Sequence, residues 1–324
     1  ALEPPAQISV ASLLVWQPIW AGNFGHFFSE ALPRLLRLLP FLHARPDLSL
    51  FFAGGQPFNR VAFELLGETA GAAGLTERIV RYDPCAVYVA DQMFVALASG
   101  RIPPSHATAA RLRDALRRPS LAPPRRWWAR PSAAPSFVLF IDRSDAAARK
   151  NPGHQSNATV PRTIINMDEA FDAARDELTP LGIELRRFRA ADMTPAEQLQ
   201  LVGQARGIIG VHGAGLAHAV ALPDGAAMLE LVPAREHIPN RLTTSTWHAA
   251  PSAPDAETIP ADVSSQCGFT MYWAFAASLG VRYHALVLHD AEDEDERLSV
   301  PVRPLRQIVR AMVSADGDAG LIAS

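Results

Sequence analysis

The stretch GIIGVHGAGLAHAVALPDGAAMLELVP, residues 207–233, constrains the fold of this chain more than any other segment. It contains a short apolar run at 207–211, a segment with helical spacing at 214–222 and a second apolar run at 226–232. This order predicts strand, helix, strand, which is the repeating unit of a parallel α/β sheet.

Two glycines, Gly213 and Gly215, lie in the turn between the expected strand and helix. Glycine lets the backbone turn sharply and approach another molecule closely, and a helix N-terminus directs N–H groups and partial positive charge into the turn, which suits phosphate. A turn without a ligand is equally compatible, because the glycine order is GxxGxG and not GxGxxG or a Walker loop. We expect Glu230, at the end of the following strand, to accept hydrogen bonds from ribose hydroxyls.

Three motifs together resemble glycosyltransferase family 61. The C-terminal signature of that family is similar to HGAGL followed by a helix, PDG and ELVP. Its N-terminal landmark is similar to GNFGHFFSEALPRL at 22–35, and its middle landmark is similar to RTIIN at 162–166. The resemblance implies a GT-B type fold, in which two Rossmann-like α/β domains face each other across a cleft. Together with the turn chemistry it gives the expected nucleotide-sugar-binding residues: Arg143, Arg162, Asn166, His212, Gly213, Ala214, Gly215, Leu216 and Glu230.

Arg143 and Arg162 are singled out among the many cationic residues because the family has an arginine after the corresponding strand and an R-x-I-x-N element. The leaving diphosphate needs neutralisation, and arginine forks suit phosphate oxygens. The spacer between the two arginines is longer here than is usual in the family, which leaves their partnership open.

His26 and Glu30 are four residues apart on the first expected helix, so their side chains share a face. One reading is structural, with His26 capping a turn and Glu30 pairing with Arg34. The other makes them the catalytic pair that takes the proton of the acceptor hydroxyl, a role that suits histidine or a buried carboxylate.

The expected domain organisation has three parts. Residues 1–125 form the acceptor-side domain, residues 126–300 the nucleotide-sugar-binding domain, and residues 301–324 a C-terminal helix and tail that can cross back to the first domain. The boundary is placed in the segment 117–136, which is rich in proline and basic residues. Further strands are expected at 8–16, 48–53, 78–83, 137–142, 183–188 and 281–288, and helices at 23–39, with a break at Pro33, and at 58–66, 168–178, 195–205 and 268–279. The apolar stretch 85–98 is not assigned to a class of element.

Composition and charge limit the partners. The chain has 324 residues, 48% of them hydrophobic and 19% charged, which describes a globular protein long enough for two domains. A net charge of −3 gives no broad basic surface, so nucleic acid is not an expected partner. No apolar run reaches the roughly 18 residues that span a bilayer. Membrane contact is therefore expected only through an N-terminal anchor outside this sequence.

No metal or other cofactor is expected. The acidic triplets at 293–295 and 316–318 lie in a solvated charge run and near the C-terminus, and the histidines lack zinc spacing. GxSxG and CxxC are both missing from the sequence. Cys85 and Cys267 fit either a disulfide or two buried thiols. Asn157 begins a glycosylation sequon, which indicates a Golgi or ER lumen if the protein is eukaryotic; a bacterial protein would be cytoplasmic.

Two functions fit these observations. The first is an inverting, metal-independent transferase that moves a sugar from a UDP-sugar of the xylose, N-acetylglucosamine or arabinose type to a hydroxyl of a polysaccharide or glycoprotein. The second is a catalytically silent module on the same fold that binds a nucleotide sugar or a glycan.

Overall fold

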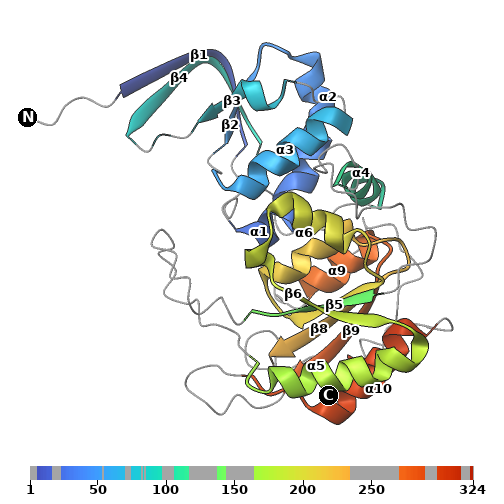
Figure 1. Ribbon diagram of the computed structural model, residues 1–324. Coiled ribbons are helices and arrows are strands. Elements are labelled where there is room, and N and C mark those ends of the chain that lie inside the picture. The colour runs from blue at the N-terminus through green and yellow to red at the C-terminus, as the bar shows by residue number, and fades with distance from the viewer. Residues whose placement is uncertain are drawn as a thin grey trace, which may run out of the picture.

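The computed structural model describes residues 6–16, 23–52, 55–69, 74–81, 83, 85–96, 106–116, 137–143, 164–233, 270–288, 298–314 and 322–323. These residues form two parallel sheets with helices packed on them (Figure 1). The expected α/β class is confirmed.

The first sheet has the strand order β3-β2-β1-β4, and every described pair of neighbours is parallel. This is the order of one half of a Rossmann sheet. Its strands are β1 (Ala6–Val15), β2 (Ser49–Phe52), β3 (Ile79–Arg81) and β4 (Ala86–Val95), and its helices are α1 (Phe24–His26), α2 (Leu32–Ala44), α3 (Pro57–Thr69) and α4 (His106–Leu116). The stretch 85–98, which the sequence left unassigned, supplies the edge strand β4.

The second sheet has the order β10-β9-β8-β7-β5-β6 and is also parallel. Its strands are β5 (Phe137–Ile141), β6 (Glu184–Phe188), β7 (Gly207–Val211), β8 (Ala227–Pro233), β9 (Arg282–Leu288) and β10 (Ile322–Ala323), and its helices are α5 (Met167–Leu178), α6 (Pro195–Val202), α9 (Thr270–Ser278) and α10 (Val302–Val313). The chain runs outward from β5 to β6 and then returns past β5 to β7. This order is the flavodoxin-like one, with the strand order reversing between β5 and β7.

Helices cover both faces of the second sheet, as buried parallel strands require. Strands β5, β7 and β8 are buried along their whole length. On one face, Phe140, Ile209 and Leu229 pack in a core with residues of α5 and α10. On the other face, Leu139, Ile208 and Met228 belong to a core that includes residues of α6 and α9 and continues to the helices of the first sheet (Figure 1). One apolar core therefore spans both sheets.

The structure interrupts one expected helix close to the break expected at Pro33 and changes the class of another helix. The helix expected at 23–39 is divided into α1, a π-helical turn (Phe27–Ala31) and α2, and Pro33 lies in the first turn of α2. Proline is tolerated there because the first helical N–H groups have no partner within the helix. The helix expected at 214–222 is a 3₁₀ helix, η7 (Ala214–Ala221). At eight residues it is longer than the usual 3₁₀ run of about three or four residues.

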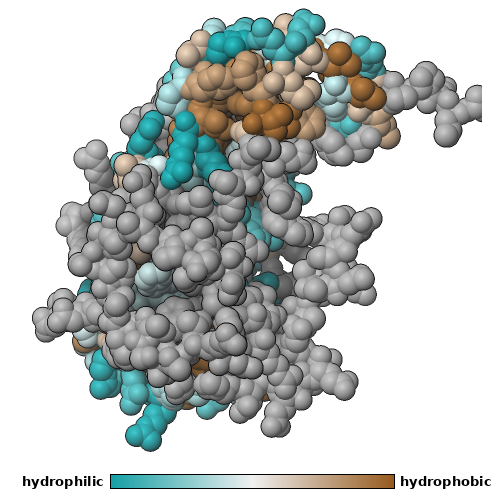
Figure 2. All heavy atoms as spheres, turned by 180° about the vertical axis from the view of Figure 1, so that it is seen from behind, coloured by the Kyte–Doolittle hydropathy of each residue, from teal (hydrophilic) through white to brown (hydrophobic). Residues whose placement is uncertain are grey.

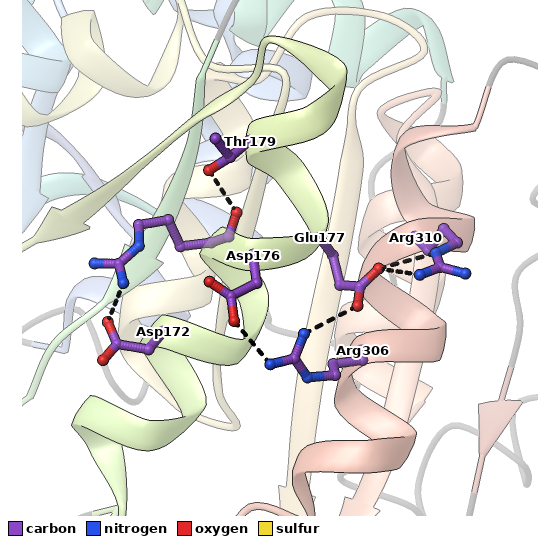
Figure 3. Close-up of polar contacts among 7 residues, drawn as sticks. Asp172, Asp176, Glu177, Thr179, Arg306 and Arg310 are labelled. Carbon is purple, nitrogen blue, oxygen red and sulfur yellow. Dashed lines mark hydrogen bonds and ion pairs between the residues drawn. The ribbon is translucent and has the colours of Figure 1, made fainter.

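The described part of the C-terminal segment stays on the second domain. Helix α10 packs beside α5, where Arg306 pairs with Asp176 at 2.8 Å and with Glu177 at 3.1 Å (Figure 3). Arg310 pairs with the same Glu177 at 2.6 Å. The hydrogen bond from Arg310 has the largest effect in lowering the pKa of the Glu177 carboxyl, and the one from Arg306 lowers it further. From the sequence, the C-terminal helix was considered able to cross back to the first domain. Helix α10, residues 302–313, does not do so.

Apolar side chains gather on the N-terminal part of the surface (Figure 2). On edge strand β4, Val87, Val89, Met93 and Val95 are all exposed. Cys85, just before this strand, has a free thiol and is exposed, contrary to the buried position considered from the sequence, while Cys267 lies outside the described residues. Within the described part of the chain, no helix is both long and apolar enough to cross a membrane.

Candidate functional site

The strand order of the second sheet fixes where a ligand can be held. In doubly wound sheets, ligands bind outside the carboxyl ends of the strands, at the point where the order reverses. Here that point lies between β5 and β7. Strand β5 leads into Asp142 and Arg143, and β7 leads directly into His212 and Gly213. Three of the residues expected from the sequence, Arg143, His212 and Gly213, therefore flank the same switch point.

The turn after β7 requires glycine at its centre. Gly213 has φ 148° and ψ −179°, a conformation that residues with a Cβ rarely adopt. Its carbonyl oxygen accepts a hydrogen bond of 2.6 Å from the Tyr272 hydroxyl on α9, and the Tyr272 ring meets the His212 ring edge-on. The turn is therefore held in an otherwise unfavourable conformation by a neighbouring helix.

Hydrogen bonds link His212 to the buried Glu230 on the next strand and, through Glu230, to the buried Tyr283 on the strand after that. Its Nδ1 forms a short hydrogen bond with Glu230 Oε1 on β8. The other oxygen, Glu230 Oε2, accepts a hydrogen bond of 2.6 Å from the Tyr283 hydroxyl on β9. Burial, together with the Glu230 charge and this hydrogen bond, raises the pKa of Tyr283 well above 10, so its hydroxyl remains a donor.

The position of Glu230 differs from the sequence expectation. We expected it at the end of its strand, but β8 continues three residues further to Pro233, and Glu230 is fully buried. The expectation overlooked that the apolar run at 226–232 continues past Glu230 through Leu231 and Val232. His212 and Tyr283 each form a hydrogen bond with one of the two Glu230 carboxylate oxygens. This arrangement favours a role of Glu230 that acts through His212. A direct contact of Glu230 with the ribose stays a prediction.

The remaining expected donor residues lie in different environments. Ala214 and Gly215 are half-buried at the start of η7, whereas Leu216 is fully buried, so its side chain belongs to the core. Asn166 is joined to Val300 by two hydrogen bonds of 2.9 Å, donating through Nδ2 and accepting through Oδ1. This pairing links the start of α5 to the segment before α10. Arg162 lies outside the described residues.

Arg143 follows a buried carboxylate that the sequence did not single out. Asp142 is only 3% exposed and accepts hydrogen bonds of 2.9 Å from the guanidinium of Arg189, which follows β6. Because β5 and β6 are parallel neighbours, their carboxyl ends bring these groups together. The signal in the sequence was a charged residue directly after each strand.

On the side of the first domain, the expected pair is in contact. His26 Nδ1 and Glu30 Oε1 are 2.8 Å apart, and both side chains are partly buried, at 22% and 14% exposed. A π-helical turn begins directly after His26 and contains Glu30. Such turns are rare overall but are often found at functional sites. The hydroxyl of Ser29 in this turn donates a hydrogen bond of 2.7 Å to the Gly25 carbonyl.

The two glycine-containing motifs touch each other directly. A Cβ on Gly25 would lie 3.0 Å from Ala214 Cα, so only glycine allows α1 to pack this closely on the start of η7. The Phe24 ring stacks on the His218 ring of η7, with 4.2 Å between centroids. His218 Nε2 pairs with Gln198 Oε1 at 2.9 Å and its Nδ1 with the Gly215 carbonyl oxygen at 2.7 Å. Burial lowers the pKa of His218 to about 4, and a neutral ring carries one N–H, which donates to only one of these two oxygens.

Within the described residues, no group of three or more His, Cys, Asp or Glu could hold a metal ion. The acidic triplets at 293–295 and 316–318 lie outside those residues. The geometry thus defines a class: a parallel α/β protein whose polar side chains gather at the ligand-binding end of a doubly wound sheet.

The comparison with protein families specifies that class further. A family model described as Glycosyltransferase 61 matches residues 24–229. The chain belongs to glycosyltransferase family 61, as the three motifs predicted.

Two curated plant proteins are similar over part of the chain. The β-1,2-xylosyltransferase of Arabidopsis thaliana is 30% identical over 123 residues, which cover 36% of this chain and 22% of that protein. The β-1,2-xylosyltransferase RCN11 of Oryza sativa subsp. japonica is 31% identical over 114 residues, covering 34% and 20%. The similarity thus spans about a fifth of each of these relatives.

Among solved structures, the iron-containing dodecameric glycosyltransferase TibC from enterotoxigenic E. coli H10407 is 13% identical, with a TM-score of 0.32. The match covers 68% of this chain and 61% of that one. A likeness this low carries no conclusion about the function of this chain.

Proposed function

We propose that this protein is an inverting, metal-independent glycosyltransferase of GT-B type, which transfers a sugar from a UDP-sugar to a hydroxyl of a polysaccharide or glycoprotein. The names of the two plant relatives make xylose the first donor sugar to test. N-acetylglucosamine and arabinose are the other candidates.

The observation that carries this proposal is the contact between α1 and the turn after β7. It brings the His26–Glu30 pair of one domain next to the glycine turn of the other. In a GT-B enzyme the second domain holds the donor, so the group that deprotonates the acceptor comes from the first. The family assignment and the switch-point position of Arg143 and His212 support the same division of roles.

In the proposed reaction, the acceptor oxygen attacks the anomeric carbon of the sugar from the side opposite the diphosphate. The bond from that carbon to the diphosphate oxygen breaks, and the acceptor proton passes to the His26–Glu30 pair. Arg143, the turn N–H groups and Arg162 neutralise the charge that develops on the leaving UDP. Fixed cations in these positions take the place of a divalent metal.

The test is a donor screen with UDP-xylose, UDP-N-acetylglucosamine and UDP-arabinose, in which release of UDP is measured with and without EDTA. We expect turnover with one donor, unchanged by EDTA and lowered by Arg143→Ala. Activity that EDTA abolishes and manganese restores would contradict the metal-independent mechanism. Tight UDP binding without turnover on any donor or acceptor would instead support the silent binding module.

A further inference from the structure

Strand β4 is exposed to a degree that is unusual in a parallel sheet. None of its residues, Ala86–Val95, is buried, whereas β5, β7 and β8 of the second sheet are buried along their whole length. Parallel strands are normally covered on both faces, because their connections place helices there. The exposed face of β4 is therefore the place on the first sheet where a partner can pack.

The first half of β4 also has little support from neighbouring strands. Strand β2 pairs with β1 only at residues 13–15, so residues 6–12 of β1 and 86–92 of β4 form a two-stranded ribbon that projects beyond the helices (Figure 1). Within the described residues, no strand pairs with the outer edge of β4. Two paired strands are marginally stable on their own, and a long edge with apolar side chains is a template for a further strand.

The exposed apolar side chains of β4 form a symmetric row on one face. Side chains alternate between the two faces of a strand, and the odd-numbered positions carry the exposed apolar ones. These are Val87, Val89, Met93 and Val95, with exposed fractions of 49%, 42%, 53% and 56%. Asp91, which is also exposed, lies at the centre of the row. Because the next two odd positions on either side of Asp91 are apolar, the row is complementary to an identical strand that runs the opposite way.

We propose that β4 pairs with β4 of a second copy of this chain, antiparallel and centred on Asp91. The first sheets of the two copies then join into one continuous sheet. A two-fold axis through the centre makes the two contact surfaces identical, as a closed dimer requires. Val87 lies opposite Val95 of the partner subunit, and Val89 lies opposite Met93 of the partner subunit.

The backbone of β4 is oriented for this pairing. Ala96, directly after β4, donates its N–H to the Val15 carbonyl of β1, so the even-numbered residues direct their N–H and C=O groups toward β1. These groups alternate along a strand, and the odd-numbered residues of β4 therefore direct theirs to the outer edge. In the proposed dimer the backbone hydrogen bonds form at the same positions that carry the apolar contacts.

Other registers suit the row less well. A shift of the pairing by two residues places Asp91 opposite Met93 of the partner subunit in one direction and opposite Val89 of the partner subunit in the other. Either shift sets a carboxylate against an apolar side chain, which is costly. The centred register sets the two Asp91 carboxylates opposite each other at an exposed position. Like charges directly opposite are destabilising, so this pair weakens the dimer and makes the register testable.

The first experiment measures association of the whole chain by analytical ultracentrifugation over a range of concentrations. The contact is a single strand from each copy, so we expect a reversible dimer that dissociates in the micromolar range. Val89→Lys and Met93→Lys should each raise the dissociation constant by about tenfold or more, because each dimer then sets two lysines against apolar side chains. Asp91→Asn should lower it severalfold, because it removes the like-charge pair.

The matched control is Leu181→Lys, because Leu181 is also an exposed apolar residue, at 55%, and lies on the second domain. It should leave the dissociation constant unchanged. A compensating pair then tests the register. Val89→Lys combined with Met93→Glu in one chain sets lysine opposite glutamate in the dimer, so it should restore the association that Val89→Lys loses. A double variant that stays as weak as Val89→Lys would show that these two positions do not face each other.

A cross-linking experiment locates the centre of the contact. Residues in a hydrogen-bonded antiparallel pair have Cα atoms about 5.5 Å apart, a spacing that a disulfide spans. In a background of Cys85→Ser and Cys267→Ser, Asp91→Cys should give a disulfide-linked dimer under mild oxidation. Val87→Cys should not, because position 87 faces position 95. A wild-type chain that is monomeric at all concentrations, or equal cross-linking through both cysteine variants, would overturn the proposal. In the monomeric case another protein, or another part of the chain, covers this face.

Discussion

His26 and Glu30 form the polar contact on which the proposed proton transfer depends. General-base catalysis contributes about 10² to 10⁴-fold, so His26→Ala should lose turnover in that range while UDP affinity stays unchanged. Glu30→Gln should lose less if Glu30 only orients the ring. Steady-state rates and UDP titrations on both variants test this. An inactive Glu30→Gln beside an active His26→Ala would reverse the roles, and full activity of both would place the base elsewhere in the first domain.

His218 is the residue whose titration should be visible in stability. Its pKa is lowered by burial from 6.5 to about 4, so the unfolded chain binds a proton between these pH values and the folded chain does not. The unfolded state is therefore favoured as the pH falls from about 6.5 to about 4, by roughly 1 to 3 kcal/mol in total. Thermal unfolding followed over this range should show a falling Tm.

His218→Gln is the matched variant, because it removes the titrating ring and keeps a polar side chain. His284, whose pKa burial also lowers to about 4, still titrates in it. The fall of Tm with pH should therefore be shallower in His218→Gln but not eliminated. Equal slopes for the variant and the wild type would show that His218 is not the cause.

At the scale of elements, the contact between α1 and η7 sets the distance between the motif that contains Gly25 and the motif that contains Gly213 and Ala214. Gly25→Ala would place a methyl group 3.0 Å from Ala214 Cα, and overpacking of this kind costs about 1 to 3 kcal/mol. We expect a lower free energy of unfolding and a larger loss of turnover than of UDP affinity, since the acceptor side moves away from the donor turn. Denaturant unfolding and steady-state rates measure the two effects.

Gly55→Ala is the control for that variant, because a Cβ on Gly55 would meet nothing within 4 Å. It should change neither stability nor turnover appreciably. A Gly25→Ala protein as stable and as active as Gly55→Ala would show that the contact between α1 and η7 is easily displaced.

At the scale of the whole molecule, the sequence predicted what local patterns encode. The α/β class, the strand, turn and helix order around His212 and the i, i+4 pairing of His26 with Glu30 all follow from spacing within a few residues. The three motifs also predicted the family, which the family comparison confirms.

What the sequence could not predict depends on contacts between distant segments. Tyr283 is 53 residues from Glu230 in sequence and reaches it only because β9 pairs with β8. The close approach of Gly25 to Ala214 likewise arises from the packing of distant segments on each other. The spacing of apolar residues along the sequence does not predict such packing.

The apolar core that spans both sheets has a consequence for how the molecule unfolds. Buried side chains of the π-helical turn (Phe27–Ala31), α2 and α3 share that core with those of η7, α9 and the second sheet. Neither part can therefore lose its structure without exposing apolar surface of the other. We therefore expect a single cooperative transition in scanning calorimetry, with equal calorimetric and van't Hoff enthalpies. Two resolved heat-absorption peaks would contradict this. For the same reason, a fragment ending at residue 116 should aggregate rather than fold as an independent domain.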